Sequence, residues 1–265
     1  MSEANSEPFF TPPVNKRSEA FSPPLRAGIA LLAPALISIL VSVLTSNLLS
    51  PAPPDSRTAT AVILGSAGLT SWLIGIAWYG IPGLGIRLKR PLFASIGFAV
   101  MGWVTYLIFH FFWVELEGFG PAGSTQAFIY LLLFEAFAVQ IWTFGLFFRA
   151  LSDWRGPLTA TIISGLLFGL IAFLFFRESF FSNITSLIFF LMWGIFYGII
   201  RLRTGSLLGT VIIQAMQSFT AWVVMVPVQI PPHPAAMHII YFLTSLAFLI
   251  FIWRLWPKEV SDYRV

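Results

Sequence analysis

The sequence predicts an all-α membrane protein, an eight-transmembrane-helix bundle. Of its 265 residues, 57% are apolar and 10% are charged, whereas roughly 25% of a soluble domain is charged. The apolar residues gather in runs of about the 20 residues that a helix needs to cross a bilayer, and the basic residues fall mainly between these runs. A water-soluble fold of this size is therefore excluded.

The chain starts with a polar tail, residues 1–26, which we expect to be flexible and cytoplasmic. The first apolar run, Ala27–Leu49, follows this tail. It is longer than the apolar region of a signal peptide and lacks an A-x-A cleavage site before Ser50. We therefore interpret it as a retained first span, which opens a membrane domain over residues 27–256.

Seven further apolar runs follow along the chain. They are Thr58–Gly80, Leu92–Val114, Thr125–Phe148, Leu158–Phe176, Ile184–Ile200, Ser206–Val226 and Ala236–Trp256. Clusters of proline and glycine, which mark turns, separate several of these runs. The clusters are Pro51–Pro54, Ile81–Gly85, Gly118–Pro121 and Pro231–Pro234. Residues 257–265 then form a short cytoplasmic C-terminal tail.

Eight spans place both termini on one side of the membrane and assign each basic residue to a side. Thirteen fall on the side of the termini: Lys16, Arg17, Arg26, Arg87, Lys89, Arg90, Arg149, Arg155, Arg201, Arg203, Arg254, Lys258 and Arg264. Arg57 and Arg177 fall on the other side. Because cytoplasmic loops are enriched in Lys and Arg, we expect both termini to be cytoplasmic. We expect the membrane to be a bacterial plasma membrane, with the lipid bilayer as the partner. This orientation explains the excess of basic residues, so no nucleic acid partner is expected.

The composition also limits the chemistry. The absence of cysteine excludes a disulfide framework, a thiolate zinc site and a cysteine nucleophile. The three histidines, His110, His233 and His238, are not spaced as pairs at i+3 or i+4. We expect no metal and no cofactor, and we interpret these histidines as interfacial or capping groups.

Polar side chains inside the spans need a reason, because lipid cannot satisfy them. Glu135 lies near the middle of the fourth span, with Gln140 one turn further on. An acid at this depth costs about 2.5–3.5 kcal/mol, so it is either protonated or hydrogen-bonded. Glu135 has two possible roles: a structural hydrogen bond to another helix, or the transfer of a proton or the binding of a ligand.

The seventh span carries a polar stripe at helical spacing, formed by Thr210, Gln214, Gln217 and Ser218. Residues three or four apart share one face of a helix, so the stripe must look into the bundle. It either joins helices by hydrogen bonds or lines a polar pocket.

Two G-x-x-x-G pairs predict close helix packing. Gly165 and Gly169 lie in the fifth span, and Gly194 and Gly198 lie in the sixth. Small residues at this spacing let two helix backbones approach each other. We expect contacts within the chain rather than dimerisation.

The segment from Phe144 to Ser218 resembles a known family. Its blocks begin with Phe144-Gly-Leu-Phe-Phe-Arg-Ala-Leu and Ile163-Ser-Gly-Leu-Leu-Phe-Gly-Leu-Ile-Ala. Gly194-Ile-Phe-Tyr-Gly-Ile-Ile-Arg-Leu-Arg and Gln214-Ala-Met-Gln-Ser follow. In this order they are similar to the CPBP family, which includes type II CAAX prenyl endopeptidases and bacteriocin-immunity (Abi) proteins. The resemblance implies a CPBP-like core at about residues 125–226 of this chain.

The resemblance also implies where catalytic groups would lie. The family's first motif has two glutamates before an arginine; the arginine is Arg149, but the glutamates fall on Phe144 and Gly145. The second motif pairs a phenylalanine with a histidine, which fall on Phe168 and Ala172. The third motif's histidine and asparagine fall on Gln214 and Ser218. Arg149 and Phe168 thus keep the motif's residues, whereas Phe144, Gly145, Ala172, Gln214 and Ser218 replace the family's catalytic ones.

We therefore expect no catalytic residues and a proteolytically inactive membrane binding or scaffolding subunit. A remnant pocket lined by Arg149, Phe168, Gln214, Gln217 and Ser218 would bind an apolar segment of a transmembrane partner protein, or a lipid. One alternative is an active intramembrane endopeptidase of the CAAX-processing type. The second is a small proton-coupled transporter that uses Glu135.

Overall fold

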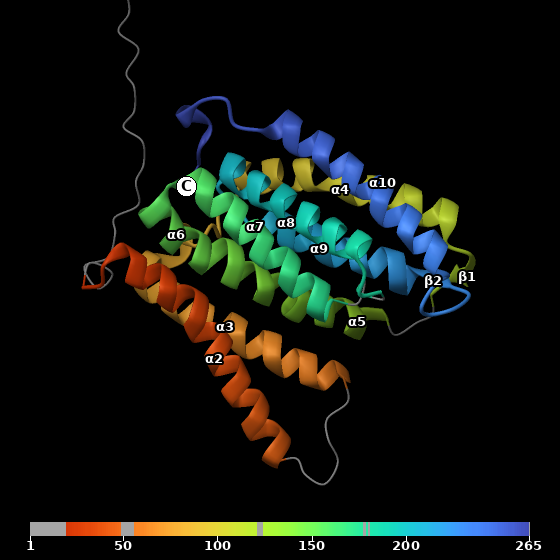
Figure 1. Ribbon diagram of the computed structural model, residues 1–265, viewed down its shortest axis with the longest axis horizontal. Helices are drawn as coiled ribbons and strands as arrows, with labels where there is room; N and C mark the ends of the chain where they lie inside the picture. The colour runs from red at the N-terminus through yellow and green to blue at the C-terminus, as the bar shows by residue number, and fades with distance from the viewer. Residues whose placement is uncertain (1–19, 49–55, 121–123, 177–178, 180, 265) are drawn as a thin grey trace, which may run out of the picture.

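The computed structural model describes residues 20–48, 56–120, 124–176, 179 and 181–264. Most of the predicted N-terminal tail, the turn Pro51–Pro54 and Arg177 lie outside the described residues. The described chain is almost entirely helical (Figure 1), so the predicted class, an all-α membrane protein, is confirmed.

Seven of the described helices are long and apolar enough to cross a membrane. They are α2 (Pro23–Leu48), α3 (Ser56–Gly83), α4 (Arg90–Trp113), the helix Ser124–Arg155, α7 (Pro157–Phe175), α8 (Ile184–Thr204) and α10 (Pro234–Leu255). Each corresponds to a predicted span, and most ends differ by a few residues. Helix α2 starts before the predicted Ala27, because proline is well tolerated in a first helical turn.

The fourth of these helices changes its geometry in the middle. Helices α5 (Ser124–Tyr130) and α6 (Phe148–Arg155) flank two π-helical segments, η1 (Leu131–Ala138) and η2 (Ile141–Phe147). In a π-helix each N–H bonds five residues back rather than four, which widens the turn. These segments were not predicted from the sequence.

The seventh predicted span, Ser206–Val226, is a shorter helix than the others. It consists of α9 (Leu208–Phe219) and a π-helical turn, η3 (Thr220–Val224). It nevertheless runs alongside α4 between the same two ends. The N–H of Leu207 bonds to the carbonyl of Gly85 at one end, and the carbonyl of Val224 accepts from Gly120 at the other.

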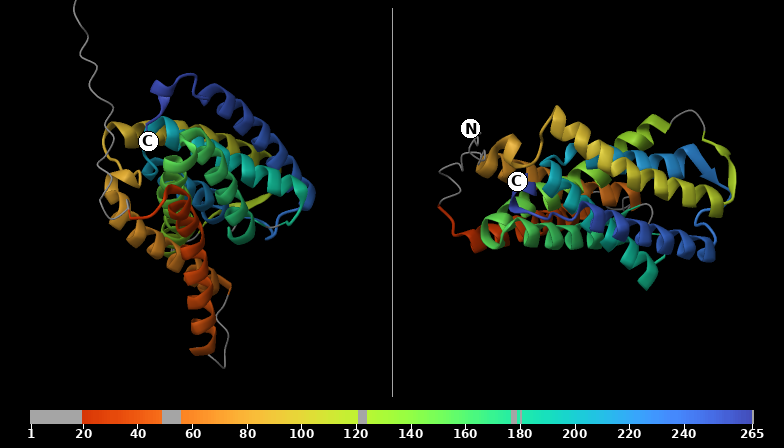
Figure 2. Two further views of the ribbon diagram at one scale, coloured as in Figure 1. Left: turned by 60° about the vertical axis from the view of Figure 1, so that its left-hand side comes forward. Right: turned by 90° about the horizontal axis from the view of Figure 1, so that it is seen from above.

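The helices form a bundle with one divergent pair (Figure 1). Helices α7, α8 and α9 lie in the middle, and α4 and α10 cover one side. Helices α2 and α3 contact each other and diverge from the bundle toward the bottom of the view, which is also clear after rotation (Figure 2, left). Many apolar side chains of α2 are therefore exposed to the surroundings rather than to protein.

The two glycine pairs face each other across the contact between α7 and α8, as predicted. A methyl group on Gly165 would lie 2.8 Å from the carbonyl oxygen of Gly194, and one on Gly198 would lie 2.8 Å from that of Thr161. Any larger residue would push the two backbones apart. The glycines thus determine how closely these central helices pack.

A small antiparallel sheet was not predicted. Strand β1 (Leu116–Phe119) pairs with β2 (Met225–Pro227) where the sequence predicted only a turn at Gly118–Pro121. The pairing also joins Val228 N–H to the carbonyl of Glu115. Backbone groups that leave a helix still need hydrogen-bond partners, and the two chain segments supply them to each other.

Basic residues gather at the opposite end of the bundle from the sheet. Arg26 forms an ion pair with Asp153, with nitrogen and oxygen 3.0 Å apart. The C-terminal residues fold back onto this end, because the N–H of Arg264 bonds to the carbonyl of Leu202. The side of the membrane on which this end lies remains a prediction.

Candidate functional site

A chain of side-chain hydrogen bonds crosses the centre of the bundle from α9 to the π-helical segments. The Thr210 hydroxyl donates to Oε1 of Gln140 at 2.6 Å, and Nε2 of Gln140 donates to Oε1 of Gln214 at 2.7 Å. All three side chains are at most 1% exposed. The polar stripe of the seventh span therefore looks into the bundle, as predicted.

The π-helical geometry gives this network its last acceptor. Nε2 of Gln214 donates to the backbone carbonyl oxygen of Glu135, in η1, at 2.9 Å. An α-helical carbonyl is normally occupied by the N–H four residues on, whereas π-helical turns rearrange this ladder. Gln140, between the two π segments, supplies the other contact to Gln214. Sequence analysis noted Gln140 without identifying it as the partner of the stripe.

Two further residues of the stripe lie beside this network. Gln217 and Ser218 are 1% and 2% exposed, and both lie near the end of α9. Nε2 of Gln217 has no hydrogen-bond partner within the described part of the chain. The carboxyl side chain of Glu135 is also buried. The stripe thus joins α9 to the π-helical segments by hydrogen bonds, and Nε2 of Gln217 is a donor that these bonds do not use.

An aromatic cluster includes Phe144, at a position that the resemblance assigns to a glutamate. The rings of Phe144 and Phe168 are 5.3 Å apart between centroids. Phe168 also contacts Trp193 and Tyr197, with centroids 6.0 Å and 5.9 Å away. Both phenylalanines and Ala172 are fully buried. Apolar rings fill this part of the bundle.

Gly145, the second of the two glutamate positions, lies in a tight environment in η2. A methyl group there would lie 3.0 Å from Cδ1 of Ile141 and 3.5 Å from the carbonyl oxygen of Leu84. A longer side chain would require these neighbours to move.

Arg149 contacts neither the glutamine network nor the aromatic cluster. It lies at the end of the bundle opposite the sheet, where the basic residues gather, which we call the arginine-rich end. Its Nε is 3.6 Å from a carboxyl oxygen of Asp153, one turn further along the chain. Its guanidinium also lies 5.9 Å from the ring centroid of Tyr79. The residues expected to line one remnant pocket thus belong to three sets: the glutamine network, the aromatic cluster and this ion pair.

The structure also shows a buried cation that sequence analysis treated as a loop residue. Arg201 is in the last turn of α8 and is fully buried. Its Nε donates to the carbonyl of Phe144 at 3.3 Å, which connects the arginine-rich end to the aromatic cluster. No feature of the sequence distinguishes Arg201 from the other basic residues at the ends of the apolar runs.

The histidines lie toward the sheet end. His110 is fully buried, with its ring 4.6 Å from that of Trp222 in an edge-to-face arrangement. His233 caps α10, because its Nδ1 accepts from the N–H of Ala235. The interpretation of His233 as a capping group is confirmed.

Fold and site together define an integral membrane protein with a polar network and an aromatic core at its centre. Residues 121–220 match the model of the family described as Type II CAAX prenyl endopeptidase Rce1-like. This match confirms the predicted CPBP resemblance over these residues, which are similar to the Rce1-like family. No curated protein matches the chain.

Proposed function

We propose that this protein is a proteolytically inactive member of its family that acts as a binding or scaffolding subunit within the membrane. The observation that carries this proposal is the packing of Phe144 against Phe168. These rings occupy positions where the family resemblance would place an acid and its aromatic neighbour.

The chemistry supports the same conclusion. Hydrolysis of a peptide by water needs a base to accept the proton and donors for the developing oxyanion, each worth about two to four orders of magnitude in rate. Phe144, Gly145 and Ala172 supply neither group. Gln214 can donate a hydrogen bond but does not titrate near neutral pH, and its amide is already engaged on both sides.

A groove beside the divergent helix pair supports a binding role. It has a volume of about 260 Å³ and lies between α3 and η1. Its lining is mainly apolar: Gly65, Gly68, Leu69, Trp72, Leu133, Phe134, Phe137 and Ala138. We propose that a transmembrane helix of a partner protein occupies this groove, rather than the aromatic-filled centre.

A cleavage assay tests the loss of proteolysis. The purified protein in liposomes is given a prenylated CAAX peptide, with an active member of the family as positive control. We expect no cleavage above that of empty liposomes. Cleavage that disappears in Gln214→Ala would overturn the proposal and establish an active endopeptidase.

Photo-crosslinking in native membranes tests the binding surface. A photoreactive amino acid replaces Leu69, in the groove, or Leu174, on α7; both side chains are 60% exposed, so the pair is matched. We expect a discrete protein adduct from position 69 that is absent from position 174. Equal labelling from both positions, or lipid adducts alone, would contradict a partner helix in the groove.

A further inference from the structure

The buried guanidinium of Arg201 has an unusual environment. Its Cζ lies 5.1 Å from the ring centroid of Phe148, and its Nε bonds to a backbone carbonyl. On another side it lies directly against Gly85, where a methyl group would come within 2.5 Å of Cζ. Gly85 has a φ of +83°, which glycine adopts readily. The backbone is thus shaped to approach this side chain.

The terminal nitrogens of Arg201 are not satisfied by the protein. Neither Nη1 nor Nη2 has a hydrogen-bond partner among the residues that the structure describes. A buried charge is costly unless it is paired and hydrogen-bonded. A fully buried guanidinium with two unused nitrogens, four N–H groups in all, is therefore suited to an anion.

Neighbouring charges reinforce this preference. Arg87 lies two residues beyond Gly85, against which the Arg201 guanidinium packs, and Arg149 follows Phe148, whose ring lies 5.1 Å from that guanidinium. Burial, and then the charge of Arg149, lowers the pKa of Arg87. Arg26 and Arg149 share the carboxylate of Asp153, so this acid already has two arginine partners.

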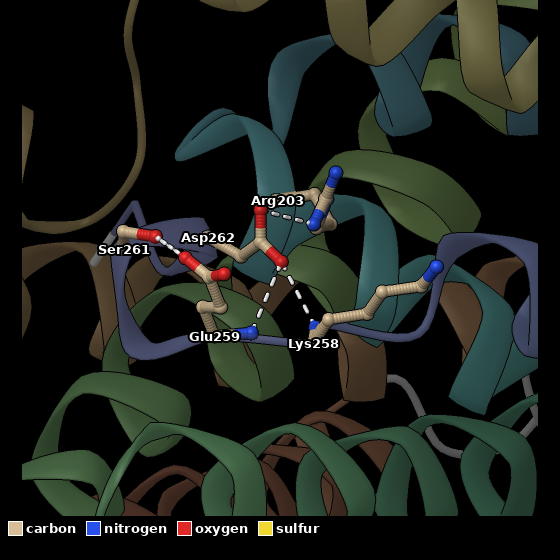
Figure 3. A network of polar contacts seen from close by, with 5 residues as sticks. All are labelled: Arg203, Lys258, Glu259, Ser261 and Asp262. Atoms are coloured by element: carbon tan, nitrogen blue, oxygen red, sulfur yellow. Dashed lines mark hydrogen bonds and ion pairs between the residues drawn. The ribbon is translucent and has the colours of Figure 1, made fainter.

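The other described acids near this end, Asp262 and Glu259, lie in the C-terminal segment and have partners of their own. Figure 3 shows Asp262 paired with Arg203 at 2.6 Å and accepting from the N–H groups of Lys258 and Glu259. Within the described part of the chain, the Arg87 side chain bonds to the carbonyl oxygens of Pro82 and Arg264, at 3.3 Å and 3.4 Å. Both bonds are long, so this half-buried side chain is weakly held.

The cluster lies at the end of the bundle where several spans begin or end. Helix α4 begins at Arg90, and α6 and α8 end at Arg155 and Thr204, so several spans terminate at this level. Basic pockets between transmembrane helices at this depth bind anionic headgroups. The planar fork of arginine matches the oxygens of a phosphate.

We propose that Arg201, Arg87 and Arg149 form a binding site for a phosphate group, supplied by the headgroup of an anionic phospholipid. The site is separate from the groove and contacts the aromatic cluster through the backbone carbonyl of Phe144. It uses no group that could activate water, so the proposal does not depend on whether the protein cleaves peptides.

A thermal-shift titration tests this site. The delipidated protein in neutral detergent is titrated with short-chain phosphatidylglycerol, with short-chain phosphatidylcholine, and with inorganic phosphate. We expect phosphatidylglycerol to raise the unfolding temperature and phosphatidylcholine to have little effect. Arg201→Gln should weaken the apparent affinity about tenfold or more, because charged hydrogen bonds are lost.

Arg254→Gln is the matched control. It removes the same charge from an exposed side chain at the end of α10 and should leave the affinity unchanged. If Arg201→Gln fails to fold, Arg87→Gln takes its place, since that side chain is only half-buried. Native mass spectrometry of the protein extracted from membranes then counts retained anionic lipids.

The outcomes separate the possibilities. An equal response to inorganic phosphate, lost in Arg201→Gln, keeps the phosphate site but overturns the lipid as its source. No response to either probe, or the same response in Arg201→Gln and Arg254→Gln, overturns the site itself.

Discussion

The contact between α7 and α8 predicts that Gly169→Ala destabilises the protein although it adds a single methyl group. The new Cβ would lie 2.6 Å from the carbonyl oxygen of Phe190 and 2.7 Å from Cα of Leu191. Both neighbours are backbone atoms of α8, so no side-chain rotation can relieve the clash. The two helices must move apart.

The size of the effect follows from these distances. Ordinary contact starts at 3.4 Å, so the shortfall at the Phe190 oxygen is 3.4 − 2.6 = 0.8 Å. A gap of about 0.5–1 Å forfeits a quarter to a half of the dispersion energy of each affected atom pair. Overpacking costs about 1–3 kcal/mol, and alanine recovers up to about 1 kcal/mol of helix propensity. We expect a net loss of about 1–2 kcal/mol.

Unfolding in detergent micelles, followed by tryptophan fluorescence, measures this loss, because Trp193 is buried within α8. The control is Gly97→Ala in α4, where no atom lies within 4 Å of the added methyl group. That variant should be as stable as the wild type or slightly more stable. If Gly169→Ala unfolds at the same temperature as Gly97→Ala, the close approach of α7 and α8 is refuted.

Three further predictions concern other parts of the molecule. Gln214→Leu should lower the free energy of unfolding by about 1 kcal/mol, since buried interhelical hydrogen bonds are worth about 0.6–1.7 kcal/mol, and this loss should shrink when Gln140 is already leucine. Gly85→Ala should destabilise the protein by at least about 1 kcal/mol, because alanine at φ +83° is strained and its methyl group would meet Arg201. Hydrogen bonds from backbone N–H groups, chiefly that of Lys258, lower the pKa of Asp262 from 3.8. The docking of the C-terminal residues should therefore be complete above about pH 4 and be lost as the pH falls through this lowered pKa; amide hydrogen exchange of that segment measures it.

Each of these three predictions has an outcome that contradicts it. Additive losses in the Gln140→Leu and Gln214→Leu double-mutant cycle would show that the two amides do not interact. A Gly85→Ala protein as stable as Gly97→Ala would contradict the tight contact at Arg201. In Asp262→Asn, the C-terminal segment should exchange rapidly and without this acid transition; an unchanged transition would identify another titrating group.

Most of the fold was predictable because a bilayer imposes strict rules on a sequence. Seven apolar runs became helices long enough to span a membrane, and the glycine pairs met as their spacing indicated. The sheet of β1 and β2 was not predicted, because it pairs segments far apart in the sequence. The π-helical segments were missed because their composition does not differ from that of an apolar α-helix.

The candidate site was predictable only in part. The spacing of Gln214 and Gln217 indicated an inward face, but it could not identify Gln140 as the partner. Arg201 was counted among the loop residues because sequence position at the end of a span does not reveal burial. Side chains that meet across helices depend on rotation and depth, which hydropathy does not encode.

The three sets of contacts in the central segment have different physical roles. The aromatic cluster around Phe168 has shape but no titrating group, so it can stabilise the bundle but cannot activate water. The glutamine network ties α9 to the π-helical segments and uses hydrogen bonds that lipid could not replace. The arginine-rich end carries charge without enough acids to balance it. The unsatisfied guanidinium nitrogens of Arg201 thus lie at one end of the bundle rather than at its centre, which is why we expect its specific ligand to bind at that end.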